Sequence, residues 1–381
     1  MRFDSGLLVH SGDVSNYPPI DEWRGTLLMM EAAGFTGVWV AEHHFFWDGW
    51  LQPTPTNPVM FGAFAASLTE RLRIGQCGVC LPDWHPIRVA EDVATLDHMT
   101  GGRVDFGMIR GLNSRVNGNF NADADRRDGG RVHALFWESY DVIRNAWGPK
   151  PLRHRGQFYQ FPVAGWFDQS VNPDSFDPDH YTADGELVGL SVLPKPFQQP
   201  NPPSYVMADS ASSTVAAAER GLGVISFAQT LGLSTSVLKR YRESFVPGAM
   251  REPSFGVMRP TFVARTSAEA EAVLRPSVNE LMRKISGGYS SVWSSREAFL
   301  APGDELTQWD READWYDFLV SRQWCFVGTP DEVVEQIQRY EDAGIKHVVG
   351  YWALPFVTYE QMMASQRLLA DQVMPHFGGG Q

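Results

Sequence analysis

Short apolar runs alternate with longer amphipathic segments along most of the chain, and this alternation constrains the fold more than any other feature. Eight apolar runs have the length and composition of strands, at residues 3–9, 37–41, 72–81, 104–109, 204–208, 223–227, 255–264 and 346–351. The segments between them include six with helical spacing of apolar residues, at 22–33, 88–99, 131–147, 214–220, 268–274 and 331–342. Such alternation is typical of β/α units on a parallel sheet, and eight units predict a (β/α)8 TIM barrel.

Two connections are too long to be simple crossovers between strands. They cover residues 111–203, after the fourth strand, and residues 265–345, after the seventh. We therefore predict one barrel domain over residues 1–381 with these two long excursions. Residues 155–203 are rich in proline, aspartate and aromatic residues, and we expect them to form a lid or substrate-binding excursion. No Gly-x-Gly-x-x-Gly follows the first strand, which disfavours a dinucleotide-binding Rossmann fold.

The last predicted helix, 331–342, carries the clearest boundary signals in the chain. Thr329 is a good N-cap residue, and Pro330 suits the first turn. Gly344 follows just past the end, where a helix often needs a left-handed residue.

The composition argues against several classes of partner. A net charge of −13 disfavours nucleic acid and anionic membranes, because both are bound by basic surfaces. No stretch approaches the ~20 consecutive apolar residues of a membrane span. The N-terminus does not have the pattern of a signal peptide, and the chain has only three cysteines, so we expect a cytoplasmic protein.

Cys77 and Cys80 have the spacing of a metal or redox motif, but we expect neither function. On a continuous strand over 72–81, two residues three positions apart point to opposite faces. No second Cys-x-x-Cys is present to complete a metal site. Adjacent His43 and His44 also point apart on a strand, which disfavours a metal-dependent hydrolase.

Polar and aromatic residues stand at the carboxyl end of most predicted strands, where barrel enzymes carry their active sites. The second strand ends in Glu42, His43 and His44, although a satisfied core histidine is an equally good interpretation of these residues alone. Later strands end in or are followed by Trp84, Arg110, Asp209, Ser210, Ser213, Phe227 and Trp352. Their convergence on one rim predicts a cofactor site.

The segment after the fifth predicted strand indicates what the cofactor carries. Ser210, Ser212 and Ser213 introduce a helix, and N–H groups together with hydroxyls at a helix start suit an anion. N-capping by one serine is the alternative, but three serines exceed that need and favour phosphate. Arg110 and Arg131 could supply positive charge, and a surface salt bridge is the alternative for each.

Several ordered segments resemble the bacterial luciferase-like family of flavin-dependent monooxygenases. They are AGFTGVWVAEHHF (33–45), RIGQCGVCLPDWHPIRVAEDVATLDHMTGGRVDFGMIRG (73–111), SYVMADSASSTVAAAERGLGVIS (204–226), FVGTPDEVVEQIQRYEDAGIKHVV (326–349) and DQVMPHF (371–377). The resemblance runs nearly end to end. It implies the same (β/α)8 barrel, with a long excursion that caps the site.

The resemblance also implies roles for the rim residues. His43 would lie near the flavin and help to form or protect the adduct of reduced flavin with oxygen, and His44 is the second catalytic candidate. The residues implied to contact FMN are Glu42, Cys77, Gly78, Arg110, Arg131, Asp209, Ser210 and Ser213, with both arginines and both serines at the phosphate. In the family a non-prolyl cis peptide lies under the isoalloxazine ring at the position of Cys77–Gly78.

Two departures from the luciferases bear on the activity. Asp209 stands where those enzymes usually have glutamate, and Ile109 stands where they have a cysteine before the rim arginine. Because the excursion at 155–203 differs as well, the resemblance does not imply a long-chain aldehyde substrate or light emission.

The implied enzyme is an FMN-dependent monooxygenase. It would take reduced FMN from a separate reductase and use O2, through a flavin C4a-peroxide, to oxygenate a small apolar substrate. A deazaflavin-dependent hydride-transfer oxidoreductase on the same barrel is the alternative, and a non-catalytic barrel is disfavoured by the retained site residues.

A homodimer is implied by the family. The predicted pocket walls are Trp47, Trp84, Phe227 and Trp352, and each tryptophan is individually as consistent with a core position.

Overall fold

The structure is a computed structural model that describes residues 1–7, 20–45, 55–168, 177–248, 250–285, 295–352 and 354–378. Trp47, one of the predicted pocket residues, lies outside these ranges. The chain divides into two compact units. The first comprises residues 1–79, 105–108 and 203–381, and the second comprises residues 80–104 and 109–202.

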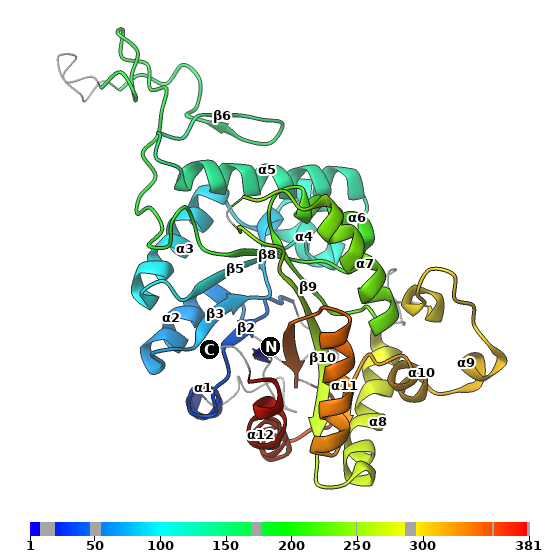
Figure 1. The fold of residues 1–381 in the computed structure, drawn as a ribbon. Coiled ribbons are helices and arrows are strands. Elements are labelled where there is room, and N and C mark those ends of the chain that lie inside the picture. The colour runs from blue at the N-terminus through cyan, green and yellow to red at the C-terminus, as the bar shows by residue number, and fades with distance from the viewer. Residues whose placement is uncertain are drawn as a thin grey trace. The chain divides into compact units, whose positions relative to one another are not determined.

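In its described residues, the first unit is built on a closed barrel of eight parallel strands, which confirms the predicted (β/α)8 fold (Figure 1). The strands follow one another around the barrel in chain order, and the last pairs with the first. They are β1 (Arg2–Leu7), β2 (Gly37–Val40), β3 (Arg73–Gln76), β5 (Val104–Ile109), β8 (Ser204–Met207), β9 (Gly223–Ser226), β10 (Phe255–Val263) and β12 (His347–Tyr351). Each predicted strand region contains one of them.

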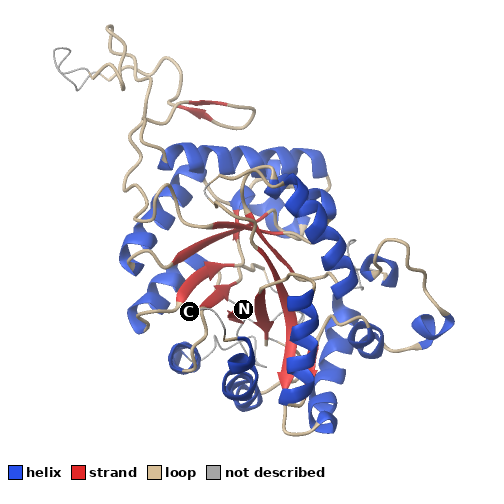
Figure 2. Ribbon diagram, viewed as in Figure 1, coloured by secondary structure: helices blue, strands red, loops and turns tan. Residues whose placement is uncertain are grey.

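Helices of the first unit lie outside these strands (Figure 2). They include α1 (Ile20–Ala32), α2 (Pro58–Leu68), α6 (Ala211–Ala218), α7 (Leu231–Ser244), α8 (Ser267–Lys284), α11 (Pro330–Asp342) and α12 (Tyr359–Leu368). The boundary signals of α11 are confirmed, because Thr329 and Glu332 form a capping box and Gly344 has a φ of 85°. Within the described ranges, no helix has both the length and the apolar character needed to cross a membrane.

The excursion after β10 returns to the sheet before α11. It contains α9 (Gln308–Glu312), α10 (Trp315–Ser321) and a short strand, β11 (Phe326–Gly328). β11 pairs in parallel with the end of β10, with Phe326 opposite Thr261. The excursion therefore adds a short strand to β10 without interrupting the closed barrel.

The regular structure described in the second unit is mainly helical, and long loops connect it. Its elements include α3 (Pro86–Thr100), α4 (Ser114–Phe120), α5 (Gly129–Trp147) and a hairpin of β6 (His154–Arg155) and β7 (Gln160–Phe161). The indole Nε1 of Trp147 donates to the carbonyl of Ala90 at 2.9 Å, which ties α5 to α3. Buried Asp97 accepts from the backbone N and the side-chain Nε2 of Gln198, both at 2.7 Å. The end of the long connection 111–203 is therefore anchored on α3.

The predicted strand 72–81 is not continuous, which corrects the sequence-based interpretation of Cys77 and Cys80. β3 ends at Gln76, a two-residue strand β4 (Val79–Cys80) follows, and the Cys77–Gly78 peptide bond between them is cis. Gly78 lies so close to the next strand that a Cβ there would be 2.8 Å from the backbone N of Met108. The argument that the two cysteines point to opposite faces of one strand is therefore wrong.

The N-terminal end of the barrel holds a buried ion network within the first unit. Arg2 Nη2 lies 2.6 Å from Asp4 Oδ2 and from Asp105 Oδ2, and Arg73 Nη2 lies 2.6 Å from Asp105 Oδ1. His347 Nε2 lies 2.8 Å from Asp4 Oδ2. Burial alone raises the pKa of Asp4, but Arg2 and His347 hold it well below its usual range. Ion pairs thus link β1, β3 and β5 at this end, and a hydrogen bond from His347 joins β12 to them.

Candidate active site

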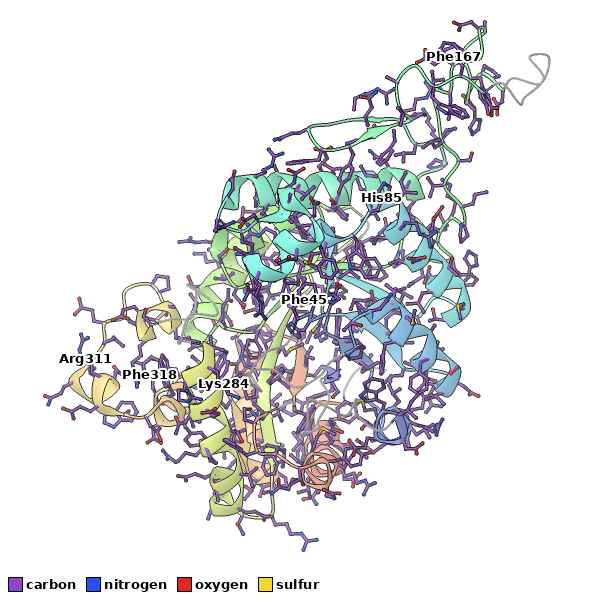
Figure 3. The ribbon with its side chains drawn as sticks, turned by 180° about the vertical axis from the view of Figure 1, so that it is seen from behind. Phe45, His85, Phe167, Lys284, Arg311 and Phe318 are labelled. Carbon is purple, nitrogen blue, oxygen red and sulfur yellow. The ribbon has the colours of Figure 1, made fainter. Side chains whose placement is uncertain are left out.

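Glu42, His43 and His44 follow β2 directly at the carboxyl end of the barrel strands. Glu42 is only 4% exposed, and its Oε1 lies 2.9 Å from Nε2 of the His44 ring. The exposed Phe45 comes next and is marked in Figure 3. A buried carboxylate therefore orients one of the two adjacent histidines.

The other histidine, His43, differs from His44 in its partners. Its ring is half-buried and makes no hydrogen bond to any residue in the part of the chain that the structure describes. Burial, together with a smaller contribution from the neighbouring His44, lowers the pKa of His43 to about 4. His43 is therefore a neutral imidazole at physiological pH, and a ligand could use its ring nitrogens for hydrogen bonding or proton transfer.

Small groups and close backbone contacts characterise the end of β3. Gly78 packs against the backbone of Gly107 and Met108 on β5, which leaves no room for a side chain. Cys77 is half-buried, and burial raises the pKa of its thiol to about 12. The residue before it, Gln76, is fully buried, and neither polar atom of its amide has a hydrogen-bond partner among the described residues.

The start of α6 shows the N-capping interpretation of its serines, and the phosphate interpretation stays a prediction. Ser210 is the N-cap and accepts a hydrogen bond from the backbone N of Ser213 at 3.2 Å, so the N-capping alternative is confirmed. The Ser210 hydroxyl also lies 2.8 Å from that of Ser213 and 3.2 Å from that of Ser212. Three hydroxyls are thus gathered at one helix N-terminus, where the peptide dipoles favour an anion.

Asp209 does not direct its carboxylate to this helix start. Its Oδ1 accepts from the backbone N of Phe227 and of Ala228, both at 2.8 Å, and from the Ser226 hydroxyl at 3.0 Å. Burial raises the pKa of Asp209, and these hydrogen bonds oppose that rise. Fully buried Arg259 donates to the carbonyls of Ser226 and Phe227 at 2.9 and 3.1 Å. The Asp209 carboxylate therefore binds backbone N–H groups of the turn after β9, and the Arg259 guanidinium binds backbone carbonyls of the same turn.

The predicted pocket residues of the first unit have different surroundings. The half-buried ring of Phe227 packs on Tyr351 at 5.0 Å and on Trp324 at 5.3 Å between ring centroids. Trp352 is 1% exposed, which places it in the core. The space for its indole comes from Gly350, where a Cβ would lie 2.7 Å from Trp352 Nε1.

In the second unit, Arg110 follows β5 and begins a tightly held corner. The side chain of buried Asn117 donates to Asp83 Oδ1 at 2.8 Å and to Cys80 Sγ at 3.2 Å, beside the Arg110 carbonyl at 3.4 Å. Arg110 Nη1 lies 3.1 Å from Nδ1 of His133. Burial lowers the pKa of Arg110, and the nearby charge of Arg126 lowers it further.

Arg131 and Trp84, also in the second unit, complete the predicted set. Arg131 is exposed and donates to Asp123 Oδ1 from Nε at 3.0 Å and from Nη2 at 2.7 Å. Its guanidinium also lies 5.0 Å from the centre of the Phe158 ring. Trp84 is half-buried, just after the 3₁₀ turn Leu81–Asp83. The salt-bridge alternative for Arg131 is therefore confirmed.

Sequence reasoning missed Gln76 and Arg126. A glutamine inside the apolar run RIGQCGVC was a detectable signal, because a buried amide needs hydrogen-bond partners. Arg126 could not be separated from its neighbours in the segment DADRRDGGR, since the local sequence does not show which arginines find a carboxylate. No group of three or more His, Cys, Asp or Glu side chains in the described ranges could hold a metal ion.

Comparison with known proteins relates this geometry to a family. A sequence model of the family described as luciferase-like monooxygenase matches residues 1–347. The oxygenase component of flavin-dependent trigonelline monooxygenase from Acinetobacter baylyi is 25% identical over an alignment that covers 99% of this chain and 96% of that protein.

Solved structures share the fold. Monooxygenase RslO1 from Streptomyces bottropensis has a TM-score of 0.75 at 21% identity, covering 99% of this chain and 100% of that chain. The oxygenating constituent of 3,6-diketocamphane monooxygenase from Pseudomonas putida, solved with FMN, has a TM-score of 0.67 at 20% identity and covers 98% of both chains. Enzymes that depend on coenzyme F420 also share the fold. Because the family match spans most of its length, the chain belongs to the luciferase-like monooxygenase family and is a flavin-dependent monooxygenase.

Proposed function

We propose that this chain is the oxygenase component of a two-component system. It takes reduced FMN from a separate reductase and uses O2 to oxygenate a small apolar organic substrate. The observation that carries the proposal is His43, a half-buried neutral imidazole with no hydrogen-bond partner in the described residues, at the carboxyl end of a barrel strand. A relative named as an oxygenase component supports the two-component arrangement.

The described residues fit a flavin. Cys77 and Gly78 place only a small thiol and bare backbone at the end of β3, so no bulky side chain of theirs would obstruct a planar ring system there. The orphaned amide of Gln76, next to it, has one donor group and one acceptor atom that no described residue uses. Ser210 and Ser213 offer hydroxyls at a helix N-terminus for a phosphate. Arg110, which lies in the second unit, stays a predicted phosphate contact.

The chain's own residues would bind and orient the flavin and the substrate, and they would exclude water from the site. Reduced flavin supplies the electrons that activate dioxygen, so that one oxygen atom enters the substrate. His43 would exchange a proton or a hydrogen bond at its ring nitrogens, and Glu42 would hold the His44 ring in place. Asp209 would act through the turn that carries Phe227 and not by direct contact with the cofactor.

The remaining predictions concern the substrate and the assembly. Phe227 and Trp84 stay candidates for the pocket wall, because both are half-buried. The core position of Trp352 makes it a weaker candidate. The lid role of residues 155–203, the homodimer and the cytoplasmic location stay predictions.

The test begins with anaerobic titration of the protein with photoreduced FMN, followed by rapid mixing with air-saturated buffer. We expect binding of reduced FMN and a return of oxidised-flavin absorbance that is at least about tenfold slower than for free FMN, because the site excludes water. His43→Gln should still bind reduced FMN but lose the delay and release the consumed oxygen as hydrogen peroxide. His376→Gln, at an exposed position, is the matched control.

Other results would favour the alternatives. Binding of a reduced deazaflavin in place of reduced FMN would support the hydride-transfer oxidoreductase. Binding of reduced FMN with no delay in the unsubstituted protein would instead indicate a barrel that keeps the cofactor but not the oxygen chemistry.

A further inference from the structure

The long connection in the second unit brings an aspartate, a histidine and a serine into one hydrogen-bonded row. Asp177 Oδ2 lies 3.0 Å from Nδ1 of His180, and Nε2 of the same ring lies 2.7 Å from the hydroxyl oxygen of Ser191. All three residues belong to the second unit, and none of them is a predicted contact of the flavin. A carboxylate, an imidazole and a hydroxyl joined in this order through these two ring nitrogens can activate a serine as a nucleophile.

Backbone hydrogen bonds hold Ser191 beside His180. Leu190, the residue directly before the serine, exchanges two hydrogen bonds with Leu152, at 2.8 and 3.1 Å. The carbonyl of His180 accepts from the backbone N of Val188 at 2.7 Å. The main chain on the N-terminal side of Ser191 is therefore tied both to the segment that carries His180 and to the segment at 152.

Gly189 allows these segments to approach so closely. A Cβ at this position would lie 2.5 Å from the carbonyl oxygen of Asp179 and 2.9 Å from Cβ of Pro151. Only a residue without a side chain fits between them. The contact of the histidine with the serine thus depends on a tight packing of three backbone segments.

The aspartate determines which nitrogen of the ring accepts. Hydrogen bonds from the backbone N of Asp179 and from His180 lower the pKa of Asp177, so its carboxylate is ionised at neutral pH and can only accept. Nδ1 of His180 must therefore carry a proton. In the neutral imidazole Nε2 is then the acceptor, and the Ser191 hydroxyl donates to it.

The serine is also accessible to a substrate. Ser191 is exposed, and the ring of His180 lies at the edge of the surface. The backbone N–H groups of Ser191 and Val192 donate to no atom of the described residues, which leaves donors next to the nucleophile for an oxygen that becomes negative. In contrast, His347 of the first unit meets a carboxylate through Nε2, but its Nδ1 has no partner among the described residues.

We propose that Ser191 and His180 form a second catalytic centre, which hydrolyses carboxylic esters. The Ser191 oxygen attacks the carbonyl carbon of the ester while its proton moves to Nε2 of His180. The bond from that carbon to the alcohol oxygen then breaks, and the alcohol leaves with the proton. Water repeats both steps on the acyl-serine, so the acid is released and Ser191 regains its proton. Asp177 is a positioning residue that acts through His180.

The first test is covalent labelling of the full chain with an alkyl fluorophosphonate, with the modified residue located by mass spectrometry. The Ser191 oxygen should form a bond to phosphorus and release fluoride, as an activated serine does. His180→Gln should lose this label. His98→Gln is the matched control, because His98 is exposed in the same unit and its Nε2 meets only the carbonyl of Lys195 among the described hydrogen-bond partners. The absence of a label on Ser191 in the original protein, or equal labelling in His180→Gln, would overturn the proposal.

The second test measures release of p-nitrophenolate from p-nitrophenyl acetate. An exposed imidazole can attack this ester by itself, and Ser191→Ala keeps His180, so the variant measures that contribution alone. The original protein and His98→Gln should be at least about tenfold faster than Ser191→Ala, because a positioned general base typically contributes about 100-fold or more. Equal rates in the original protein and Ser191→Ala would mean that the serine is not the nucleophile.

The role of Asp177 is tested by two further variants in the same assay. Asp177→Asn should lower kcat by at least about tenfold and change KM by less than about twofold, because it removes the acceptor that fixes the ring. Asp177→Glu keeps a carboxylate and should recover part of the loss. Equal losses in both variants would show that Asp177 only shapes its turn. None of these assays contains a flavin, so a negative result would leave the proposed oxygenase unaffected.

Discussion

At the N-terminal end of the barrel, Asp4 and Asp105 are bound by Arg2 and Arg73, whereas at the carboxyl end His43 has no hydrogen-bond partner in the described chain. The same strands of the first unit carry both ends. The first end uses its charges to link strands. The second leaves the His43 ring available to a ligand.

The difference teaches how one barrel separates stability from chemistry. In barrel enzymes the carboxyl ends of the strands carry the reacting groups, while the opposite face serves stability. Here the N-terminal end carries ion pairs that join different strands, whereas the carboxyl end carries His43 and the Gln76 amide without hydrogen-bond partners among the described residues. The comparison predicts that substitutions at the two ends act on different measurements.

The largest effect is expected at the N-terminal end. Asp105→Asn would leave Arg2 and Arg73 without their shared carboxylate, and breaking a buried pair in this way costs about 3–5 kcal/mol of unfolding free energy. Urea unfolding measures it. Asp21→Asn removes an exposed partner of Arg24 and should cost less than about 0.5 kcal/mol. Equal losses in the two variants would show that the network does not hold the barrel together.

A smaller effect is expected at the carboxyl end, where the substitution creates a steric clash and leaves no charge unpaired. A Cβ in Gly78→Ala would lie 2.8 Å from the backbone N of Met108, and such overpacking typically costs about 1–3 kcal/mol. We expect weaker binding of reduced FMN as well, because the shifted backbone lies beside the proposed flavin surface.

Gly129 of α5 offers the matched position for that experiment. A Cβ at Gly129 would meet no atom within 4 Å, so Gly129→Ala should change the unfolding free energy by less than about 1 kcal/mol. If urea unfolding gave the same value for both alanine variants, the contact of Gly78 with β5 would not be tight in solution.

At neutral pH the smallest effect comes from His43, which imposes a pH dependence on stability that grows only as the pH falls below about 7. Its pKa is about 4 in the folded protein and 6.5 in an unfolded chain. As the pH falls from 6.5 towards 4, the unfolded chain binds a proton that the folded protein does not, so the unfolding free energy decreases. The slope is at most about 1.4 kcal/mol per pH unit, and above pH ~7 the contribution vanishes.

His43→Gln isolates this contribution. The difference in unfolding free energy between the original protein and the variant should shift as the pH is lowered from neutral to about 5, with the original protein losing more. A difference that does not change with pH would mean that His43 titrates in the folded protein as it does in an unfolded chain.

The barrel could be predicted from the sequence because each strand is a short apolar run bounded by turn residues. Helix α11 could also be placed, since Thr329, Pro330 and Gly344 mark its ends independently of tertiary contacts. Helix α2 was not predicted, because PVMFGAFAASL is apolar on nearly all sides and shows no helical stripe. The break after Gln76 was missed for a different reason. Gly78 lies against Gly107 and Met108 of β5, and the local sequence does not show this contact.

Site residues were predictable by position on the rim but not by partner. The sequence places Asp209 beside the serines, yet its carboxylate binds the turn at 226–228, which only the folded barrel brings near. It places Trp352 after the last strand, but the space at Gly350 draws the indole into the core. The sequence does not separate Arg131 from Arg126, yet Arg131 pairs with Asp123 and Arg126 donates to the carbonyl of Gly111.

The raised pKa of the Cys77 thiol affects how readily this residue is oxidised by hydrogen peroxide. At a pKa of about 12 the sulfur stays protonated at neutral pH, and peroxide oxidises the thiolate far faster than the thiol. Hydrogen peroxide that escapes during futile cycles therefore meets a slow-reacting group at the end of β3. We expect preparations to keep this cysteine reduced through prolonged aerobic use, without added thiols in the buffer.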